Sequence, residues 1–331
     1  MQPQTIGGRP CLSVVTTLYK SAEFIQEFYS RITAAAEQLT IDYELVFVND
    51  GSPDHSLEIA ITLSHHDSRI KIVDLSRNFG HHSAILAGLR QSRGEWVFLI
   101  DIDLEERPEW LLDFWGDIQA NEADVVYGVQ AARSGSHFKR HTGTLFYKLF
   151  NATSDTQIPE NQCTVRLMKR RYVDAVAGFT ESHLFLAGLF SWTGFTQRAI
   201  YVTKTSRTSA STYSLPKLLS LFVNAITSFS AYPLKIVFAA GLCITTLSVI
   251  YACALIVSKL ARPHLVLSGF TSLMVSLWFL GGTIISTLGI VGMYVGRLFT
   301  EAKARPQYLV KQIYTGAQPA AIATDREGSL P

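Results

Sequence analysis

The chain has 331 residues, of which 48% are hydrophobic and 17% are charged, compared with about 25% charged residues in a typical soluble domain. Its formal net charge of +2 and the lack of a long basic run argue against a nucleic-acid partner. The apolar excess lies after Pro233, so the composition predicts two units. Residues 1–10 are polar, and we expect no cleavable signal peptide there.

Strand-like and helix-like patterns alternate in the first part of the chain. The β-rich runs are 12–18, 43–48, 70–75, 95–100 and 124–127. The helical patterns are 22–38, 56–64, 82–91 and 108–120. This alternation predicts βαβ units and an α/β domain with a mostly parallel sheet. Since ligands of such sheets bind beyond the carboxyl ends of the strands, candidate site residues are expected there.

Acidic residues follow two of these strands. Asp50 ends the second strand, and Asp101, Asp103 and Glu105 follow the fourth. Because alternate side chains of an extended backbone point the same way, these three carboxylates are expected to converge on one hard cation, Mg²⁺ or Mn²⁺. A solvated acidic turn is the alternative for this segment alone. Asp50 at the end of a neighbouring strand favours a metal and nucleotide site.

The loop 76–81 comes between these two acidic strand ends in the sequence. It follows the third strand and precedes a helix. Its Arg77 and its backbone amides have the chemistry to bind a phosphate group. An arginine exposed to solvent is the alternative.

Two long segments without charge follow, at 236–257 and 265–296. A helix needs about 20 apolar residues to cross a bilayer, so we expect transmembrane helices at about 236–257 and 272–296. A buried core helix of a soluble protein is the alternative. Lysines and arginines flank the outer ends of the pair more than the loop between, which favours both termini in the cytoplasm.

The expected domain division has five parts. They are an N-terminal tail at 1–10, a cytosolic catalytic domain at 11–213, a juxtamembrane amphipathic helix at 214–231, the two transmembrane helices within 232–298 and a cytosolic tail at 299–331. The amphipathic helix is expected either in the headgroup plane or against the soluble domain, and its pattern of apolar residues does not separate these alternatives.

Several motifs occur together in a fixed order. They include Asn49-Asp50-Gly51-Ser52, Ser76-Arg77-Asn78-Phe79-Gly80-His81, Asp101-x-Asp103-Leu104 and Arg166-Leu167-Met168. In this order and spacing they resemble family-2 glycosyltransferases of the GT-A fold, and more narrowly the polyprenyl-phosphate glycosyltransferases, over about residues 11–315. The resemblance implies a nucleotide-sugar donor, a polyprenyl phosphate acceptor, a Mg²⁺ or Mn²⁺ cofactor, the plasma (inner) membrane as location, and a homo-oligomer.

The resemblance also implies roles for individual residues. Asp50 is expected to contact the nucleotide base, Asp101 to lie near the ribose or metal, and Asp103 and Glu105 to bind the metal–diphosphate. Arg77 and Thr17 join the nucleotide-sugar set. The catalytic set is Asp103, Arg207, which would neutralise the leaving diphosphate, and Glu160. The set for the acceptor phosphate is Arg133, Lys139 and Arg140.

The chain departs from the family pattern at a position that bears on the chemistry. The family aspartate sometimes proposed as a base corresponds to Thr164, which leaves Glu160 as an alternative carboxylate. A phosphate monoester is largely a dianion at neutral pH, because its second pKa is about 6. Its oxygen can therefore attack without a base, provided that the enzyme positions two anions and stabilises the departing diphosphate.

The expected function is inverting transfer of one sugar from a nucleotide sugar, with a UDP-sugar favoured, to a polyprenyl phosphate, with undecaprenyl phosphate favoured. The product would serve modification of a cell-envelope glycan. A processive polysaccharide synthase and a non-catalytic membrane scaffold are the alternatives. The synthase lacks support because no Gln-x-x-Arg-Trp motif is present. The changed residues around Thr164 are the support for the scaffold.

Overall fold

The computed structural model describes residues 9–130, 159, 161–181, 184–204, 232–261, 270–316 and 318–320. They form two compact units, one built around a sheet and one that holds the long helices α9 (Tyr232–Ala261) and α10 (Phe270–Ala302). The strands are β1 (Leu12–Leu18), β2 (Tyr43–Asn49), β3 (Ile70–Leu75), β4 (Trp96–Leu99), β5 (Val125–Gln130), β6 (Gln162–Lys169), β7 (Gln197–Val202), β8 (Val310–Thr315) and β9 (Gln318–Ala320). The helices of the first unit are α1 (Ile25–Glu37), α2 (Ser56–His66), α3 (His81–Gln91), α4 (Trp110–Asn121), α6 (Arg170–Ala177) and α7 (Leu186–Trp192).

The described strands form one sheet in the order β7-β5-β6-β4-β1-β2-β3-β8-β9. Its centre, β4-β1-β2-β3, is parallel, whereas β6 runs antiparallel to both β4 and β5. All of β2 and nearly all of β1 are buried, as expected for central strands covered on both faces. The prediction of an α/β unit with parallel strands is therefore confirmed, and every predicted strand and helix of residues 12–130 is present.

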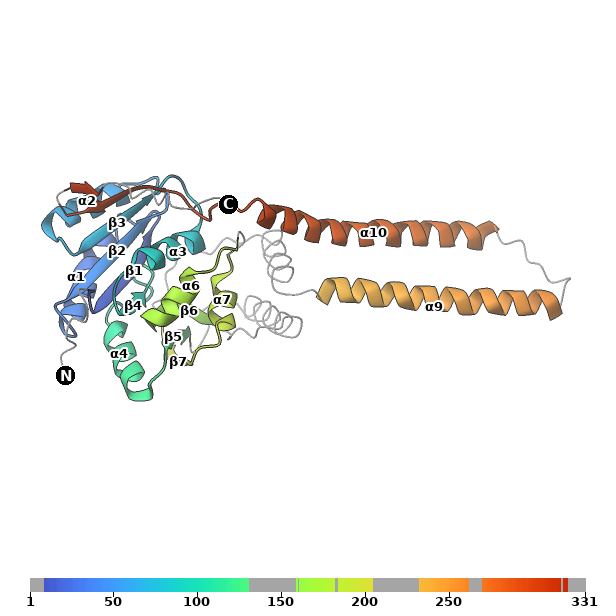
Figure 1. The fold of residues 1–331 in the computed structure, drawn as a ribbon, viewed down its shortest axis with the longest axis horizontal. Coiled ribbons are helices and arrows are strands. Elements are labelled where there is room, and N and C mark those ends of the chain that lie inside the picture. The colour runs from blue at the N-terminus through green and yellow to red at the C-terminus, as the bar shows by residue number, and fades with distance from the viewer. Residues whose placement is uncertain are drawn as a thin grey trace, which may run out of the picture. The chain divides into compact units, whose positions relative to one another are not determined.

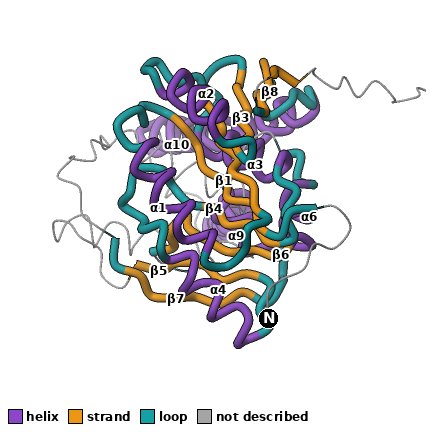
Figure 2. Tube along the Cα trace, turned by 90° about the vertical axis from the view of Figure 1, so that its left-hand side faces the viewer, coloured by secondary structure: helices purple, strands orange, loops and turns teal. Residues whose placement is uncertain are grey.

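Helices cover both faces of this sheet. In Figure 2, α1 lies on one side of strands β1 and β4, while α3 and α6 lie on the other. Gly88 of α3 allows its close approach, because a Cβ there would lie 2.4 Å from the Val15 side chain and 3.0 Å from that of Val48. The carboxyl ends of β1, β2 and β4 are consequently fixed by packing on both sides.

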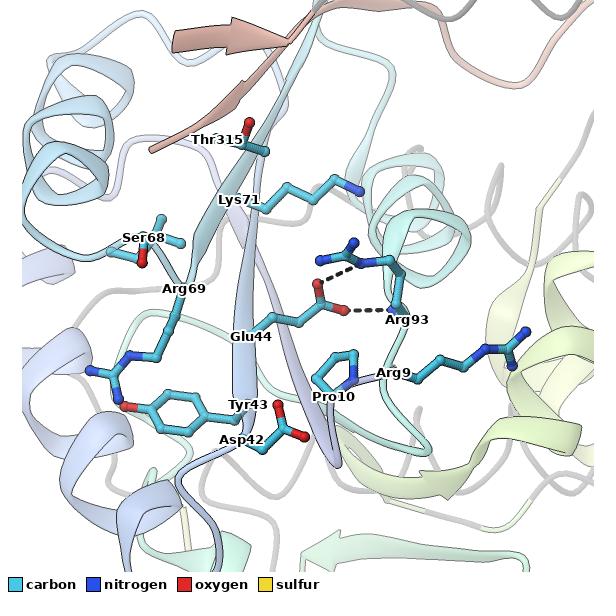
Figure 3. Close-up of a pocket in the computed structure, with 11 residues that line it drawn as sticks. Arg9, Pro10, Asp42, Tyr43, Glu44, Ser68, Arg69, Lys71, Arg93 and Thr315 are labelled. Atoms are coloured by element: carbon cyan, nitrogen blue, oxygen red, sulfur yellow. Dashed lines mark hydrogen bonds and ion pairs between the residues drawn. The ribbon is translucent and has the colours of Figure 1, made fainter. Parts of the chain in front are cut away.

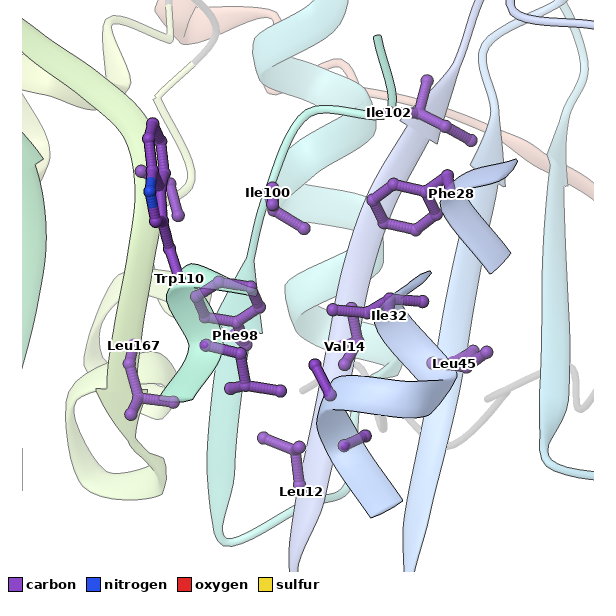
Figure 4. Close-up of a cluster of buried hydrophobic side chains, with 14 of the residues drawn as sticks. Leu12, Val14, Phe28, Ile32, Leu45, Phe98, Ile100, Ile102, Trp110 and Leu167 are labelled. Carbon is purple, nitrogen blue, oxygen red and sulfur yellow. The ribbon is translucent and has the colours of Figure 1, made fainter. Parts of the chain in front are cut away.

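The main hydrophobic core lies under α1 and α4 (Figure 4). Leu12 and Val14 of β1 face Phe28 and Ile32 of α1, and Phe98 of β4 packs edge-on against Phe114 of α4, with ring centroids 6.0 Å apart. Each of these side chains is fully buried, and burial of one such side chain contributes about 1.5–3 kcal/mol to the free energy of unfolding. This core supports the strand ends that carry the acidic residues.

The chain returns to the sheet after the long helices. Strand β8 pairs antiparallel with β3, so that the segment drawn in red lies beside blue strands in Figure 1. The backbone amide of Ser76 also donates to the carbonyl of Leu309, at 2.9 Å. Residues 310–320, which the sequence assigned to a tail, thus form part of the first unit.

The described part of the second unit contains α9 and α10, which contact each other. Among the described residues, one stretch is long and apolar enough to span a bilayer, namely Phe279–Ala302 in α10. Large apolar side chains are exposed along both helices, for example Phe238, Leu247, Ile285 and Leu288. Cys11, Cys163 and Cys243 are free thiols.

Candidate functional site

Asp50 follows β2 at the carboxyl end of the sheet and is almost completely buried. Its carboxylate accepts the backbone N–H groups of Phe79, at 2.7 Å, and Gly80, at 3.0 Å. Burial raises the pKa of Asp50, and these two amides oppose that rise. Each carboxylate oxygen has a second lone pair, so Asp50 can hold the loop and still accept a hydrogen bond from a nucleotide base.

The loop after β3 fits closely against Asp50 because of two glycines. Gly51 has φ +60°, and a Cβ there would lie 2.5 Å from the backbone nitrogen of Asn78. Gly80 has φ +95° and lies one residue before α3. Only glycine adopts such conformations without strain, which explains the glycine in both motifs.

Arg77 folds back onto its own loop. Its guanidinium lies over the ring of Phe79, 4.0 Å from the centroid, and donates to the carbonyl of Asn78 at 2.9 Å. The side chain is exposed. The remaining N–H groups of its guanidinium are available to a phosphate.

Thr17, His81 and Asp101 come together at the carboxyl ends of β1 and β4. His81 Nδ1 lies 3.2 Å from the Thr17 hydroxyl, and its Nε2 lies 3.4 Å from an Asp101 carboxylate oxygen. Burial lowers the pKa of His81, although the nearby acids oppose this effect. His81 thus joins Thr17 and Asp101, both of which were predicted to bind the nucleotide sugar. The sequence did not predict a role for His81 itself.

The segment after β4 is a turn, which corrects the expectation of an extended backbone through Glu105. β4 ends at Leu99, Leu104 has φ +61°, and the Asp103 carboxylate accepts the backbone N–H of Glu105 at 3.1 Å. Aspartate favours such turns because its short side chain bonds to the backbone two residues on. Among the described residues, no three His, Cys, Asp or Glu side chains are gathered as a metal site. The three carboxylates therefore do not follow one another along an extended strand, and their binding of a cation stays a prediction.

Glu106 also belongs to this site, and the sequence did not predict it. Its side chain is fully buried and forms an ion pair with Lys204, with Nζ and Oε1 2.9 Å apart. It also accepts the backbone N–H groups of Asp101, at 3.3 Å, and Thr164, at 3.1 Å. Burial and the neighbouring Asp101 raise the pKa of Glu106, whereas Lys204 lowers it. Only its place directly after the acidic motif could have indicated it from the sequence.

Several predicted site residues lie outside the described residues. They are Arg133, Lys139, Arg140, Glu160 and Arg207. Thr164, at the position of the family aspartate, is described. Its backbone N–H donates to the Glu106 carboxylate at 3.1 Å. The roles expected for the five basic and acidic residues remain predictions.

A pocket of about 320 Å³ lies at the other end of the strands (Figure 3). Its lining includes Tyr43 and Ile70, which begin β2 and β3, and Arg9, which precedes β1. Glu44 and Arg93 form an ion pair within it. Since parallel α/β sheets bind ligands beyond the carboxyl ends, and Asp50 and Asp101 lie there, this pocket is not the candidate site.

Comparison with known proteins shows the family of the chain. Residues 13–176 match the glycosyl transferase family 2 domain. A Mycobacterium tuberculosis protein named as a glycosyltransferase is 39% identical over 317 residues, which cover 95% of this chain and 92% of the relative. The chain belongs to glycosyl transferase family 2. This glycosyltransferase is also 37% identical to a Bacillus subtilis glycosyltransferase, over 91% of this chain and 94% of the relative.

A further relative of this family 2 glycosyltransferase carries a more specific name. The bactoprenol glucosyl transferase of Shigella phage SfII is 34% identical over 310 residues, or 92% of this chain and 99% of the relative. The resemblance to polyprenyl-phosphate glycosyltransferases is therefore confirmed. The observed α/β unit, with its parallel sheet centre and acidic strand ends, is GT-A-like, and the protein is an enzyme that transfers a sugar.

Proposed function

We propose that this glycosyltransferase moves one sugar from a nucleotide sugar, most simply a UDP-sugar, to a polyprenyl phosphate such as undecaprenyl phosphate. The observation that carries the proposal is the gathering of Thr17, His81 and Asp101, beside the buried Asp50, at one edge of the sheet. The relatives named as bactoprenol glucosyl transferases support the lipid acceptor. Asp50 is the candidate for the base, and Asp101 for the ribose or the cation.

The donor chemistry of the acidic turn fits a divalent cation. Asp101, Asp103 and Glu105 offer hard carboxylate oxygens and are all partly exposed. Mg²⁺ and Mn²⁺ are commonly held by one or two carboxylates, with substrate phosphates completing the coordination, so three converging side chains are not required. Asp103 and Asp101, with Glu105, are the residues that would hold it. A bound cation would stabilise the negative charge of the departing diphosphate.

The reaction needs no protein group to remove a proton from the acceptor. At neutral pH the acceptor phosphate is largely a dianion, and its oxygen forms the new bond to the anomeric carbon. The bond between that carbon and the diphosphate breaks on the opposite side, which inverts the anomeric centre. The presence of Thr164 at the family aspartate position is compatible with this route. Arg207, Arg133, Lys139 and Arg140 are proposed to neutralise the two phosphate groups, and Glu160 is kept as an alternative carboxylate.

The membrane arrangement in this proposal has α9 and α10 as two crossings. The exposed apolar side chains along both helices support it, as does the length of the apolar stretch in α10. Because β8 pairs with β3, the chain before α9 and the chain after α10 belong to one sheet and must lie on the same side of a bilayer. An even number of crossings meets this condition, and the basic flanks favour the cytoplasmic side.

The direct test is transfer by the full-length protein in detergent. It would be incubated with undecaprenyl phosphate and a panel of nucleotide sugars, with Mg²⁺ or Mn²⁺ and with EDTA. Mass spectrometry of the lipid fraction should detect one added hexose, and NMR should show the inverted anomer. Several sugars on one lipid would instead favour a processive synthase. No product with any donor would reject the proposal in favour of the scaffold.

A further inference from the structure

The ion pair of Glu106 and Lys204 joins three separate segments of the candidate site. Glu106 lies in the turn after β4, Lys204 follows β7, and Thr164 lies in β6. A single carboxylate receives the ammonium of Lys204, the amide of Asp101 and the amide of Thr164. Glu106 is completely buried, and a charge is tolerated there only when it is paired and hydrogen-bonded.

Glu106 brings Lys204 and Asp101 to one carboxylate, because it bonds the ammonium of Lys204 at 2.9 Å and the backbone N–H of Asp101 at 3.3 Å. Burial would lower the pKa of Lys204, but Glu106, and more weakly Asp101, raise it, so that this side chain is a cation. Two carboxylates therefore compete for one ammonium. The short contact of 2.9 Å is with Glu106.

We propose that Glu106 is a positioning residue that keeps Lys204 away from Asp101, so that the Asp101 carboxylate stays available to a divalent cation. The hydrogen bonds that Glu106 accepts from the Asp101 and Thr164 amides also tie the acidic turn to β6. This inference rests on the proposed function in one respect, namely that Asp101 faces the cation. A structural ion pair without this role is the competing explanation.

Two substitutions separate these explanations. Glu106→Gln removes the negative charge but keeps an oxygen for the two amides, so Lys204 should turn to Asp101, the remaining carboxylate. Affinity for Mn²⁺ should then fall about tenfold or more, as when groups that orient metal ligands are lost. In the double variant Glu106→Gln, Lys204→Gln the competing cation is absent, and most of the lost affinity should return. A purely structural pair would lose and regain melting temperature and Mn²⁺ affinity together, whereas the inference predicts weaker Mn²⁺ binding by Glu106→Gln protein that is still folded, well below its melting temperature.

The measurement is Mn²⁺ binding by the full-length protein, followed by the loss of the free-ion signal in electron paramagnetic resonance, with and without UDP. It needs no turnover. Glu109→Gln is the matched control, because Glu109 lies in the same region but pairs with Arg31 of α1, at 2.7 Å. That variant should melt at a lower temperature and bind Mn²⁺ with unchanged affinity.

Each outcome decides the inference. Weaker binding in Glu106→Gln with recovery in the double variant supports it. Unchanged binding in Glu106→Gln overturns it and leaves the proposed transfer reaction intact. A wild-type protein that binds no Mn²⁺ even with UDP overturns both this inference and the metal assignment. If Glu106→Gln does not fold, Lys204→Gln serves alone, and a fall in its Mn²⁺ affinity overturns the inference.

Discussion

The two acidic strand ends of the site are held in different ways. Asp50, after β2, is fixed by neutral backbone amides of the loop that follows β3. The turn after β4 is fixed by charge, through the pair of Glu106 and Lys204. Neutral amides need no counter-ion, whereas the acidic turn holds Asp101, Asp103 and Glu105 near the ammonium of Lys204, which is bonded to Glu106.

This difference divides the site into a backbone half, the loop around Asp50 that amides hold, and a charged half, the acidic turn after β4 that an ion pair holds. The loop around Asp50 has its hydrogen bonds in place and depends on two glycines for its shape. The acidic turn concentrates negative charge that a cation and a diphosphate would balance together. The nucleotide base is therefore expected to meet a rigid surface, and the diphosphate a surface that its own metal ion completes.

The largest effect should come from breaking the charged half. Asp103→Ala removes a proposed ligand of the cation, and transfer measured as kcat/KM should fall by about 100-fold or more. The loss should persist at saturating Mn²⁺. The measurement is formation of the lipid-linked sugar with the best donor of the panel.

Asp113→Ala is the control for Asp103→Ala, because Asp113 is an exposed acid of α4. It should leave both activity and melting temperature nearly unchanged. Full turnover by Asp103→Ala would remove this aspartate from the metal site, while equal losses in both variants would point to a general effect of surface charge.

The contrast between the two halves also explains what the sequence could predict. Strands β1 and β3 have the predicted bounds, since continuous runs of β-branched and apolar residues identify buried parallel strands. The grouping of Asp50 with Asp101 followed from the rule on strand ends. These features depend on local pattern and general topology.

The features that escaped prediction depend on distant partners or on one turn. Glu106 matters because of Lys204 and Thr164, which reach it from other strands. β8 pairs with β3, which lies far from it in the sequence, and its own residues do not indicate that partner. The expectation of an extended backbone from Asp103 to Glu105 failed because Leu104, between them, takes a left-handed conformation. Such side-chain turns compete locally with an extended backbone.

A smaller effect should come from breaking the backbone half. Gly51→Ala places a Cβ 2.5 Å from the nitrogen of Asn78 at φ +60°, so the loop must shift and the free energy of unfolding should fall by about 2 kcal/mol. Binding of UDP, measured by calorimetry, should weaken as well, because Asp50 loses its fixed partners.

Gly116→Ala is the control for the glycine substitution. Gly116 is exposed in α4, and a Cβ there meets nothing within 4 Å. Alanine should stabilise this helix by up to about 1 kcal/mol and leave UDP binding unchanged. If Gly51→Ala binds UDP as the wild type does, the Asp50 loop is not part of the nucleotide site.

The smallest effect is the contribution of Asp54, which follows Asp50 in the chain, to the free energy of unfolding, and it depends on pH. Burial would raise the pKa of Asp54, but hydrogen bonds from the Ser52 and Ser56 hydroxyls and from the Ala22 amide outweigh it and lower the pKa to about 2 from 3.8. A carboxyl with a lowered pKa in the folded state stabilises that state above its unfolded pKa. This contribution, about 1 kcal/mol after allowance for solvent screening, is therefore complete above about pH 4 and is lost as the pH falls towards 2.

The test compares melting temperatures of the wild type and Asp54→Asn in detergent at pH 7 and pH 3. The difference in melting temperature should narrow at pH 3, because acid partly removes the stabilising charge of Asp54 from the wild type and the asparagine variant has no such charge at any pH. An equal gap at both values would show that the Asp54 charge does not stabilise the backbone half of the site.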